Sequence, residues 1–583
     1  MTSVLQREAQ YRSDEVDFKS DLNPLLRRLF IARGAKSSAD VDLSLASLLT
    51  PDLLLGMDQA VAELITAIEN RSRILIVGDF DVDGASSCAL AIRALQQMGH
   101  NDVRFIVPNR FEFGYGLTPE IVAIARHQNP ALIITVDNGI SSVEGVAAAK
   151  ATGIRVIITD HHLPGKELPD ADAIVNPNQT GCQFPSKTLA GVGVIFYVML
   201  ALRSALRQRD WFSTDLKAPN MAQFLDLVAL GTVADVVPLD KNNRILVEQG
   251  LRRIRRGACC KGIQALIKIA NRSAANLSAS DIGFALGPRL NAAGRLDDIS
   301  IGIACLLTED EALANDLAQA LDDINLDRRQ IEQGMQQQAE DALKAIDDAH
   351  DKDLAVGMCL FNEEWHQGVV GILASRIKEQ HHRPVICFAL ANDDPDCQEL
   401  KGSARSISGF HIRDALEAVA TEHPGLMAKF GGHAMAAGLS LKREDFLAFS
   451  AAFDLETKKH LSDSDLFATV LSDGRLQASE ISLDIAKLIH YAVPWGQHFP
   501  EPIFDNQFTV VQQRIVGERH LKLVLNMVDD PQHIIDAIAF NVDVAAWPDP
   551  QVTTITAAYR LDVNRFRNRE SVQLIIQHIE KVS

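Results

Sequence analysis

Between about residues 51 and 240, short apolar runs alternate with segments whose apolar residues recur at helical spacing. Apolar runs of four or five residues rich in Val and Ile predict strands, and the segments between them are long enough for helices. This alternation is typical of a doubly wound, mostly parallel α/β sheet. The predicted strands are 73–77, 103–107, 132–136 and 156–159, and the predicted helices are 85–98, 119–127 and 142–151.

The pattern changes twice further along the chain. Residues 309–348 are rich in Ala, Gln, Asp, Glu and Leu and contain no proline, which predicts a long exposed helix connecting two lobes. The apolar runs 354–361 and 384–390 flank a helical pattern at 369–379 and predict a second α/β lobe. After about residue 461, short strand-like runs such as 508–511 and 553–557 predict a small β domain.

Composition agrees with a multidomain globular protein. The chain has 583 residues, too many for one core, and 47% of them are hydrophobic. The longest uncharged apolar stretch, 189–202, is too short to span a bilayer. The eight cysteines include no Cys-x-x-Cys pair, which favours reduced thiols over a zinc site or disulfides. We therefore expect a cytoplasmic protein without membrane contact.

Acidic and imidazole side chains gather where three of the predicted strands end. The first strand runs into Asp79, Asp81 and Asp83, and a later one ends at Asp137. A third ends at Asp160, His161 and His162, the last residues of the sequence RVIITDHH. In open parallel sheets, ligands bind at the carboxyl ends of the strands. One such aspartate would most simply be a helix N-cap, but the whole set is hard to explain as caps.

These carboxylates predict a metal site. Residues two apart on an extended chain point the same way, so the end of the first strand concentrates negative charge. Like charges held this close repel, and burial increases the repulsion. A bound cation removes this cost, and carboxylate oxygens suit magnesium, manganese or calcium.

The motifs DFDVDG at 79–84, VDNG at 136–139 and DHH at 160–162 resemble the DHH phosphoesterase superfamily. Four later segments resemble one branch of it, the RecJ-type single-strand-specific 5′→3′ DNA exonucleases. The resemblance extends from about residue 51 to the C-terminus. The four segments are VALGTVADVVPL (228–239), GPRLNAAGR (287–295), WHQGVVGI (365–372) and GGHAMAAG (431–438).

The resemblance implies two divalent ions, Mn²⁺ or Mg²⁺, bridged by Asp137. It places Asp81 and Asp79 on one ion, and Asp83, His161 and Asp235 on the other. Alone, Asp235 would be an ordinary helix-end residue, and only its segment makes it a ligand candidate. The catalytic residues implied are Asp83, Asp137, His161 and His162.

Within that set, His162 lies near the scissile phosphate as an electrophile or proton donor, or else only packs behind the site. A metal-bound His161 needs its second ring nitrogen oriented by an acceptor, and Asp160 is the candidate.

Two further arginines are candidates for binding substrate. Arg110 lies in PNRFEFGYG among three aromatic residues, and guanidinium plus aromatic faces suit a single-strand channel. The alternative is a loop whose aromatic side chains simply pack. Arg289 has Gly and Pro beside it, which predicts an irregular loop from which it reaches phosphate. Its alternative is a structural ion pair.

The second lobe offers a candidate pocket for a terminal phosphate. Glycine permits close backbone approach at Gly432, next to His433, and Ser403 and Arg405 add a hydroxyl and a bidentate clamp. The resemblance implies that this lobe holds the end of the substrate.

The net charge of −19 at first opposes a nucleic-acid partner, although the aspartate cluster contributes part of it. Residues 252–272 hold seven Lys and Arg residues and no acid, which suits a backbone-contact patch. The alternative of equal weight is a solvated helix face.

Together these observations and the resemblance predict a metal-dependent exonuclease acting in DNA repair and recombination. It would digest single-stranded DNA from the 5′ end to 5′-mononucleotides. One alternative is a phosphodiesterase for short RNA or cyclic dinucleotides, and another is a non-catalytic single-strand-binding scaffold. Besides single-stranded DNA, the candidate partners are a single-strand-binding protein and a helicase, and we expect a monomer.

The predicted fold is a two-lobed DHH phosphoesterase with a C-terminal OB-like domain. The predicted domains are an N-terminal segment (1–50), the DHH catalytic domain (51–308), a long connecting helix (309–350), a DHHA1-type substrate-binding domain (351–460) and an OB-like nucleic-acid-binding domain (461–583).

Overall fold

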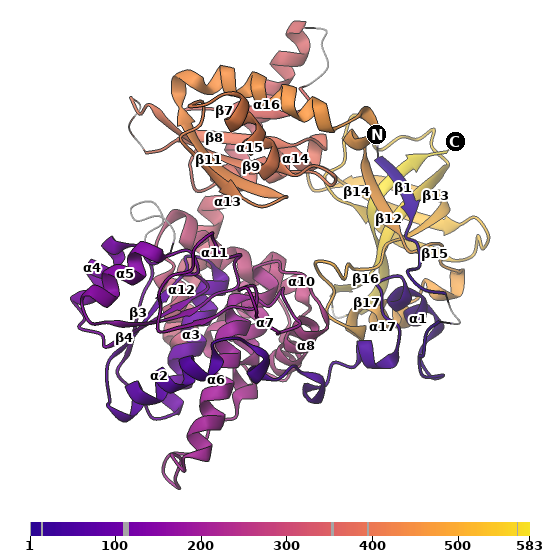
Figure 1. Cartoon of the computed structure of the whole chain (residues 1–583). Coiled ribbons are helices and arrows are strands. Elements are labelled where there is room, and N and C mark those ends of the chain that lie inside the picture. The colour runs from indigo at the N-terminus through magenta and orange to yellow at the C-terminus, as the bar shows by residue number, and fades with distance from the viewer. Residues whose placement is uncertain are drawn as a thin grey trace. The chain divides into compact units, whose positions relative to one another are not determined.

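The computed structural model describes residues 2–12, 15–108, 116–350, 355–392, 394, 396–567 and 569–582 (Figure 1). Contacts between residues divide the chain into two compact units. The smaller unit comprises Met1–Leu5 and Ile324–Val470, and the larger comprises Gln6–Asp323 and Leu471–Ser583. No helix in the described ranges is both long and apolar enough to cross a membrane.

The larger unit contains a five-stranded parallel sheet with the strand order β3-β2-β4-β5-β6. Its central strands β2, β4 and β5 are almost wholly buried, because helices cover both faces, whereas the edge strand β3 is partly exposed. This confirms the predicted doubly wound fold. The strands are β2 (Ile74–Gly78), β3 (Val103–Ile106), β4 (Leu132–Val136), β5 (Arg155–Thr159) and β6 (Ala173–Val175).

The order of the strands creates a switch point between β2 and β4. From β2 the chain passes to β3 on one side, and it then returns to β4 on the other side. The connections that follow β2 and β4 therefore diverge, and ligands bind in such crevices. This crevice lies at the carboxyl ends of β2 and β4, the strands that precede Asp79 and Asp137.

Helices α4 and α5 pack on one face of the sheet, against Leu75, Ile133 and Val156. Helices α2, α3 and α6 contact strands from the other face. The helices of this α/β part are α2 (Met57–Glu69), α3 (Val82–Gln97), α4 (Pro119–Arg126), α5 (Val143–Ala151), α6 (Gly191–Gln208), α7 (Leu225–Ala234), α8 (Lys241–Arg255), α9 (Lys261–Ile269), α10 (Ala279–Asp281), α11 (Gly287–Leu296) and α12 (Ser300–Leu307).

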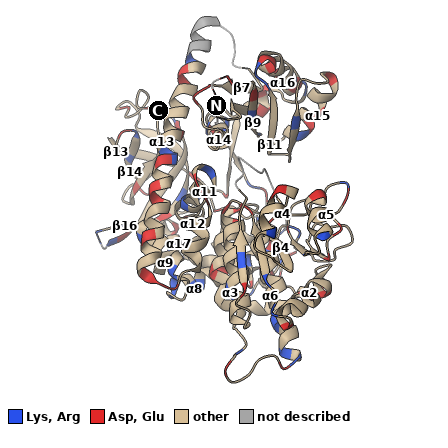
Figure 2. Cartoon of the chain, turned by 90° about the vertical axis from the view of Figure 1, so that its left-hand side faces the viewer, with Lys and Arg blue, Asp and Glu red and all other residues tan. Residues whose placement is uncertain are grey.

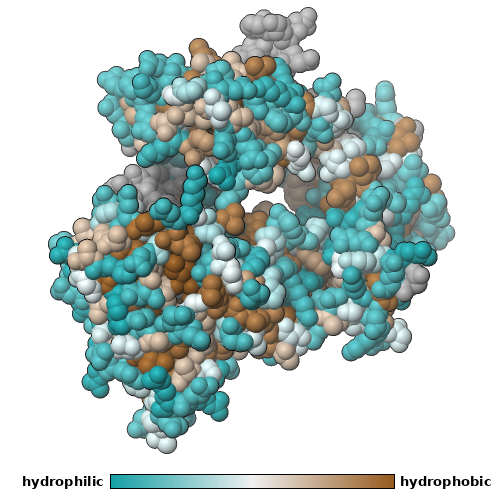
Figure 3. All heavy atoms as spheres, viewed as in Figure 1, coloured by the Kyte–Doolittle hydropathy of each residue, from teal (hydrophilic) through white to brown (hydrophobic). Residues whose placement is uncertain are grey.

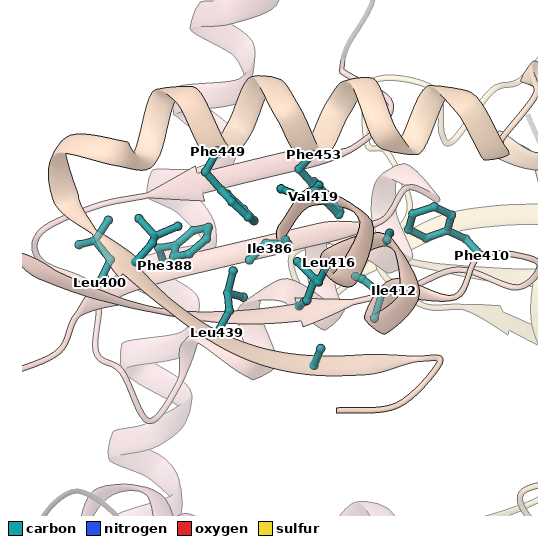
Figure 4. Close-up of a cluster of buried hydrophobic side chains, with 14 of the residues drawn as sticks. Ile386, Phe388, Leu400, Phe410, Ile412, Leu416, Val419, Leu439, Phe449 and Phe453 are labelled. Carbon is teal, nitrogen blue, oxygen red and sulfur yellow. The ribbon is translucent and has the colours of Figure 1, made fainter. Parts of the chain in front are cut away.

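The smaller unit contains a mixed sheet with the order β10-β11-β9-β8-β7, in which β7 and β8 are parallel. Phe449 and Phe453 point from α16 toward this sheet, and Leu416 points toward it from α15 (Figure 4). The elements are β7 (Met358–Phe361), α14 (Val370–His381), β8 (Val385–Leu390), β9 (Glu399–Arg405), α15 (Ile412–Glu422), β10 (Lys429–Gly432), β11 (Ala436–Lys442) and α16 (Phe446–His460).

The C-terminal part of the larger unit is a closed five-stranded barrel, which confirms the predicted OB-like domain. Strands β13 and β16 each have 13 residues, so the prediction of short strands was wrong here. The elements are β13 (Phe504–Val516), β14 (His520–Met527), β15 (Ile534–Ala539), β16 (Thr554–Phe566) and β17 (Arg569–Lys581), preceded by α17 (Leu483–Ala492).

The N-terminal segment packs against the barrel side of this unit. Arg33, which follows α1 (Pro24–Ile31), forms a bidentate ion pair with Asp473 at 2.8 and 2.9 Å. Both side chains are about 1% exposed, so the pair is desolvated and each charge needs the other. The Arg244 guanidinium from α8 lies 3.9 Å from the Phe499 ring centroid. The C-terminal domain is thus packed on the rest of this unit.

The long helix α13 (Glu311–His350) lies where the composition predicts one. Figure 2 shows acidic and basic residues scattered along it. It is not exposed all round, because Ala318, Leu321 and Met335 are buried. The remaining described strands, β1 (Thr2–Gln6) and β12 (Ala468–Ser472), pair with each other. On the face seen in Figure 3, hydrophobic residues interrupt a mostly hydrophilic surface.

Candidate metal centre

The carboxylates after β2 are positioned by the start of α3. Asp81 is the N-cap of this helix, and its Oδ1 accepts a hydrogen bond from the Gly84 amide at 3.0 Å. Asp83 follows in the first turn, where the positive end of the helix dipole favours an acid. A Cβ at Gly84 would lie 2.5 Å from the Asp79 carbonyl oxygen, so only glycine allows the chain to turn this tightly.

Asp83 is fully buried, and the start of α6 holds its carboxylate. The amides of Gly191 and Val192 donate to Oδ2 and Oδ1 at 2.6 and 2.8 Å. These amides begin a second helix, so both the hydrogen bonds and the helix dipole stabilise the negative charge.

The remaining candidate ligands converge on Asp83 from three other loops. His161 Nε2 lies 3.1 Å from Asp137 Oδ1, 3.5 Å from Asp235 Oδ2 and 4.0 Å from Asp83 Oδ2. Asp137 follows β4 with a positive φ of 62°. Asp235 is the C-cap of α7.

The described residues form three groups of possible metal ligands. Within each group, the ligand atoms lie within 4.8 Å of one another. The first group is Asp79, Asp81 and Asp137, and the second is Asp83, His161 and Asp235. The third joins Asp137, His161 and His162. The first two groups coincide with the ligand sets that the resemblance implies. Asp137 belongs to the first group, and its Oδ1 lies 3.1 Å from His161 of the second, as a bridging ligand would.

The electrostatics show how unfavourable this cluster is without a cation. Burial, followed by the neighbouring carboxylates, raises the pKa of Asp79, Asp83 and Asp137 well above the usual range. Burial and Asp81 raise the pKa of Asp235 to about 7. Burial lowers the pKa of His161 to about 4, so its imidazole is neutral at physiological pH, the form that binds metals.

The donor set fits hard divalent cations. His161 Nε2 and Asp235 Oδ2 are buried and have no hydrogen-bond partner among the described residues. A buried polar atom left in this way is costly, and a metal–ligand bond would satisfy it. Five carboxylates with one imidazole suit Mn²⁺ or Mg²⁺ better than a soft metal.

Asp160 orients His162 and not His161, so the prediction for this residue was wrong. Its Oδ1 lies 2.8 Å from His162 Nδ1 and also accepts the backbone amides of His161 and His162. Burial alone would lower the pKa of His162, but the bond to Asp160 outweighs it and raises the pKa to about 9. His161 instead makes a hydrogen bond with the backbone of Leu189.

Several residues that sequence reasoning missed fix the backbone of the DHH loop. Asn178 and Asn176, in the loop after β6, donate to the carbonyls of His161 and His162 at 2.6 and 2.9 Å. Asn138 is buried and donates to the carbonyls of Val77 and Val136, which ties the ends of β2 and β4 together. The only signal in the sequence was the Asn-Pro-Asn after a short apolar run.

In the smaller unit, strand register brings two of the predicted segments together. Ser403 is opposite Gly438, which is opposite Gly431, and Arg405 is opposite Ala436. The His433 amide donates to the Ala436 carbonyl at 2.8 Å. The segment GGHAMAAG therefore spans the end of β10, its turn and the start of β11, and β11 lies beside β9, the strand that carries Ser403 and Arg405. Gly432 has φ 146°, a conformation that favours glycine.

Arg405 and Ser403 lie beneath the first turn of α14. Arg405 Nη1 donates to Ser403 Oγ at 3.0 Å, and Nε donates to Ser375 Oγ at 3.2 Å. A Cβ at Gly371 would lie 2.9 Å from both Arg405 Nη2 and Ser403 Oγ. Glycine at 371 therefore keeps the space beside this guanidinium free of a side chain.

The two remaining arginine candidates differ in outcome. Arg110 lies outside the described residues. Arg289 is in α11, so the prediction of an irregular loop was wrong. Its Nε lies 2.8 Å from Asp322 Oδ1, and its Nη1 donates to the Ala285 carbonyl at 2.6 Å. The structural ion pair considered as its alternative is present, and its role in binding stays a prediction.

Much of the basic stretch 252–272 is engaged within the chain. Arg252 and Arg255 both contact Glu248, and the Arg255 guanidinium also lies 5.3 Å from the Tyr491 ring centroid. Arg272 is paired with Asp281 at 3.0 Å. These contacts favour the solvated helix face over a dedicated phosphate patch.

Parallel-sheet topology, a switch point lined by acids and a DHH loop together define a metal-binding DHH phosphoesterase fold. Three family models match the chain: "DHH family, N-terminal domain" at residues 73–232, "DHHA1 domain" at 351–459 and "RecJ OB domain" at 472–578. The model matches cover the parallel sheet, the mixed sheet and the barrel in turn.

Comparison with curated relatives identifies the branch of the DHH phosphoesterases to which the chain is similar. The single-stranded-DNA-specific exonuclease RecJ of Escherichia coli is 53% identical over 99% of this chain and 100% of that protein. The protein of the same name from Bacillus subtilis is 31% identical over 98% of this chain and 70% of that protein. A crystal structure of RecJ from Thermus thermophilus in complex with Mn²⁺ matches with a TM-score of 0.77 and 27% identity. This match covers 98% of this chain and 80% of that chain. The chain therefore belongs to the RecJ family.

Proposed function

We propose that this chain is a metal-dependent exonuclease that degrades single-stranded DNA from its 5′ end to 5′-mononucleotides. The observation that carries the proposal is the set of six candidate metal ligands at the switch point. They form two groups, and His162 lies close to Asp137 of one group and His161 of the other. A non-catalytic scaffold of this fold would not need to keep all six. Single-stranded DNA as substrate is supported by the names of the relatives at 53% identity.

Asp79, Asp81 and Asp137 would hold one divalent ion, and Asp83, His161 and Asp235 would hold the other. When bound, such a pair neutralises charge on the phosphate and lowers the pKa of an attacking water. Relatives have been crystallised with Mn²⁺ and with Mg²⁺, which supports either ion here.

His162 has a different role from the ligands. Its side chain is 36% exposed, compared with 12% for His161, and Asp160 fixes the orientation of its ring. The raised pKa of about 9 keeps the ring protonated at neutral pH. Protonated His162 can donate a hydrogen bond to a phosphate oxygen or give a proton to the departing 3′ oxygen. Water forms the new bond to phosphorus as the bond to that 3′ oxygen breaks.

Each such cut leaves a phosphate on the new 5′ end. A pocket that recognises a 5′-phosphate would therefore meet the same group after every turnover. Arg405, Ser403, Gly432 and His433 are the residues that we assign to this pocket, with Arg110 and Arg289 as further substrate contacts. The strand order supports the assignment, because β11 pairs both with β9, which carries Ser403 and Arg405, and with β10, which ends at Gly432 next to His433.

The decisive experiment is digestion of end-labelled substrates by the purified chain with Mn²⁺, Mg²⁺ or chelator. We expect mononucleotides from the 5′ end of single-stranded DNA with either metal. Duplex DNA, short RNA and cyclic dinucleotides should be poor substrates. Faster digestion of short RNA would favour the phosphodiesterase alternative, and equal rates from 3′ and 5′ ends would refute the polarity.

We expect Arg405→Ala to remove most of a preference for 5′-phosphorylated over 5′-hydroxyl strands. Hydrogen bonds to charged groups contribute about 1.5–3 kcal/mol, which corresponds to about 10- to 100-fold in relative kcat/KM. Competition between the two labelled strands measures this ratio. Arg376→Ala is the matched control, since Arg376 lies in the same unit and is paired with Glu332. A wild-type ratio in the Arg405→Ala protein would exclude the assigned pocket.

In the C-terminal domain, the hairpin of β16 and β17 ends in a basic tip, seen in blue beside the β16 label in Figure 2. Arg565 is paired with Glu570 at 3.0 Å, and the Arg567 guanidinium lies 5.1 Å from the ring of Phe566, which is 64% exposed. A basic tip with an exposed aromatic ring supports binding of single strands. The alternative is that this hairpin tip binds a partner protein.

We expect the double variant Arg567→Ala/Arg569→Ala to bind long single strands with a weaker salt dependence. The slope of log K against log salt should become shallower by about 0.7 for each phosphate that the variant no longer neutralises. Fluorescence anisotropy across a salt series in chelator measures this slope. The control is Arg209→Ala, which removes an exposed arginine at the end of α6. An unchanged slope would indicate that this tip docks protein partners.

The cellular setting is also part of the proposal. Activity on single-stranded DNA is consistent with DNA repair and recombination in the cytoplasm. We propose that the chain acts as a monomer, with a single-strand-binding protein and a helicase as candidate partners. We also propose that the domains of the chain end at residues 50, 308, 350 and 460, as predicted from the sequence.

A further inference from the structure

Two exposed apolar side chains flank the end of α7, beside the candidate ligand Asp235. Phe284 is 79% exposed, as much as any large hydrophobic residue in the described ranges, and Val236 is 64% exposed. Both belong to the larger unit, as does every candidate metal ligand. Single exposed apolar residues are common on proteins, so position and conformation must show whether these two matter.

Phe284 belongs to a π-helical turn, η6 (Ile282–Leu286), that precedes α11 and packs on the last turn of α7. A Cβ at Gly283 would lie 3.6 Å from Val233 Cγ1, and one at Gly287 would lie 3.4 Å from Ala234 Cβ. Val233 and Ala234 immediately precede Asp235. The turn that carries Phe284 therefore packs on the residues that deliver this ligand.

Both backbone conformations are uncommon. Val236 has φ 62°, and a β-branched side chain is a genuine outlier in this region. π-helical turns are rare and occur frequently at functional sites. The turn here is supported from within the chain, because Arg289 donates to the Ala285 carbonyl. Strain of this kind persists where the surrounding structure enforces it, and it is concentrated at active sites.

The two residues also lie on the open side of the metal centre. The side chains of Asp83 and Asp137 are 0% and 2% exposed, whereas those of Asp235 and His162 are 21% and 36% exposed. Asp81 is also only partly buried, so a phosphodiester can approach the ligands from the side of Asp81, Asp235 and His162. A base attached to that phosphodiester can then reach the apolar side chains next to Asp235.

We propose that Phe284 and Val236 form a nucleobase-contact edge beside the metal centre, with Phe284 stacking on a base of the bound strand and Val236 packing against it. An aromatic face stacks on any base, which suits an enzyme that must accept every sequence. This inference rests on the proposed exonuclease function and identifies the residues that position the strand.

The test compares strands that have or lack one base near the 5′ end. In chelator, so that nothing is cut, the wild type should bind the complete strand more tightly than a strand with a single abasic position. Phe284→Ala should lower affinity for the complete strand by about 5- to 100-fold and abolish the difference between the strands. Phe284→Tyr should restore both. Leu447→Ala, with an equally exposed residue in the smaller unit, is the control.

Outcomes of this test separate the inference from the proposed function. If the wild type degrades single-stranded DNA but Phe284→Ala binds both strands as the wild type does, the stacking role is overturned. A wild type that binds both strands equally at every abasic position also overturns it. Failure of the wild type to degrade single-stranded DNA would instead refute the proposed function. Mn²⁺ binding, measured by calorimetry, should be unchanged in Phe284→Ala.

Val236 is tested by two variants that differ in backbone strain. Val236→Ala keeps the strain and Val236→Gly relieves it, so the glycine variant should have the higher Tm. If the side chain contacts the base, both variants should raise KM several-fold by similar amounts with little change in kcat. If only one variant changes the kinetics, Val236 acts through the backbone of Asp235, and its contact with the base is overturned.

Discussion

The Asp137→Ala protein should lose at least about 10³-fold in kcat on single-stranded DNA and yet unfold at a higher temperature than the wild type in chelator. The loss follows because Asp137 belongs to one ligand group and lies 3.1 Å from His161 of the other, and metal stabilisation of the transition state amounts to several kcal/mol. The gain follows because Asp137 is buried among like charges that no cation offsets in chelator. Rapid-quench kinetics and thermal unfolding measure the two effects.

Metal addition should reverse the order of stabilities. Mn²⁺ should raise the Tm of the wild type by mass action and should raise that of Asp137→Ala much less. Asp316→Ala, which removes an exposed acid from α13, is the control and should behave as the wild type in both conditions. Near-normal hydrolysis by Asp137→Ala would exclude a shared ligand at this position.

Gly191→Ala should weaken Mn²⁺ binding by about 10- to 100-fold although residue 191 offers no ligand atom. A Cβ at this position would lie 2.6 Å from Asp137 Oδ1, and the Gly191 amide donates to Asp83 at 2.6 Å. The added methyl must therefore displace either the shared carboxylate or the start of α6. Loss of residues that orient metal ligands costs affinity in this range. We also expect about 1–3 kcal/mol of destabilisation from overpacking.

Calorimetric titration with Mn²⁺ measures the binding, and denaturant unfolding in chelator measures the stability. Gly334→Ala is the matched control, because Gly334 lies in α13 with no other atom within 4 Å of its Cβ position. That variant should bind Mn²⁺ normally and be about 1 kcal/mol more stable, as expected for alanine in a helix. Wild-type Mn²⁺ affinity in Gly191→Ala would show that the contact with Asp137 does not constrain the site.

The sequence predicted the metal centre better than it predicted what supports it. Asp79, Asp137 and His161 follow apolar strands, and parallel-sheet topology gathers such positions without any knowledge of side-chain contacts. Their separate roles, and the inclusion of Asp235, came from the resemblance. Gly191 was missed because its importance lies in a backbone amide and an absent Cβ, neither of which leaves a residue pattern. Asp160 was paired with the wrong histidine because adjacent residues offer no geometric distinction in sequence.

Ion pairs between residues far apart in the chain were also not predicted from the sequence. Arg289 looked like a loop residue because Gly and Pro precede it, but Pro is well tolerated in the first turn of a helix, and here α11 begins at Gly287. Its partner Asp322 lies in another helix, so local sequence gives no indication of the pair. The pair between Arg252 and Glu248 is local, at a spacing of four residues in α8, and was missed because the basic stretch was considered only from residue 252 onward.

The ion pair between Arg33 and Asp473 has a consequence for synthesis of the chain. The two residues are 440 positions apart, so Arg33 leaves the ribosome long before its partner exists. At about 5–20 residues per second, the interval is roughly 20 to 90 s. During that time the N-terminal segment cannot complete its native contacts, although the parallel sheet of the same unit is already whole. A nascent chain stalled before residue 473 should therefore expose its first helix to protease while protecting the sheet.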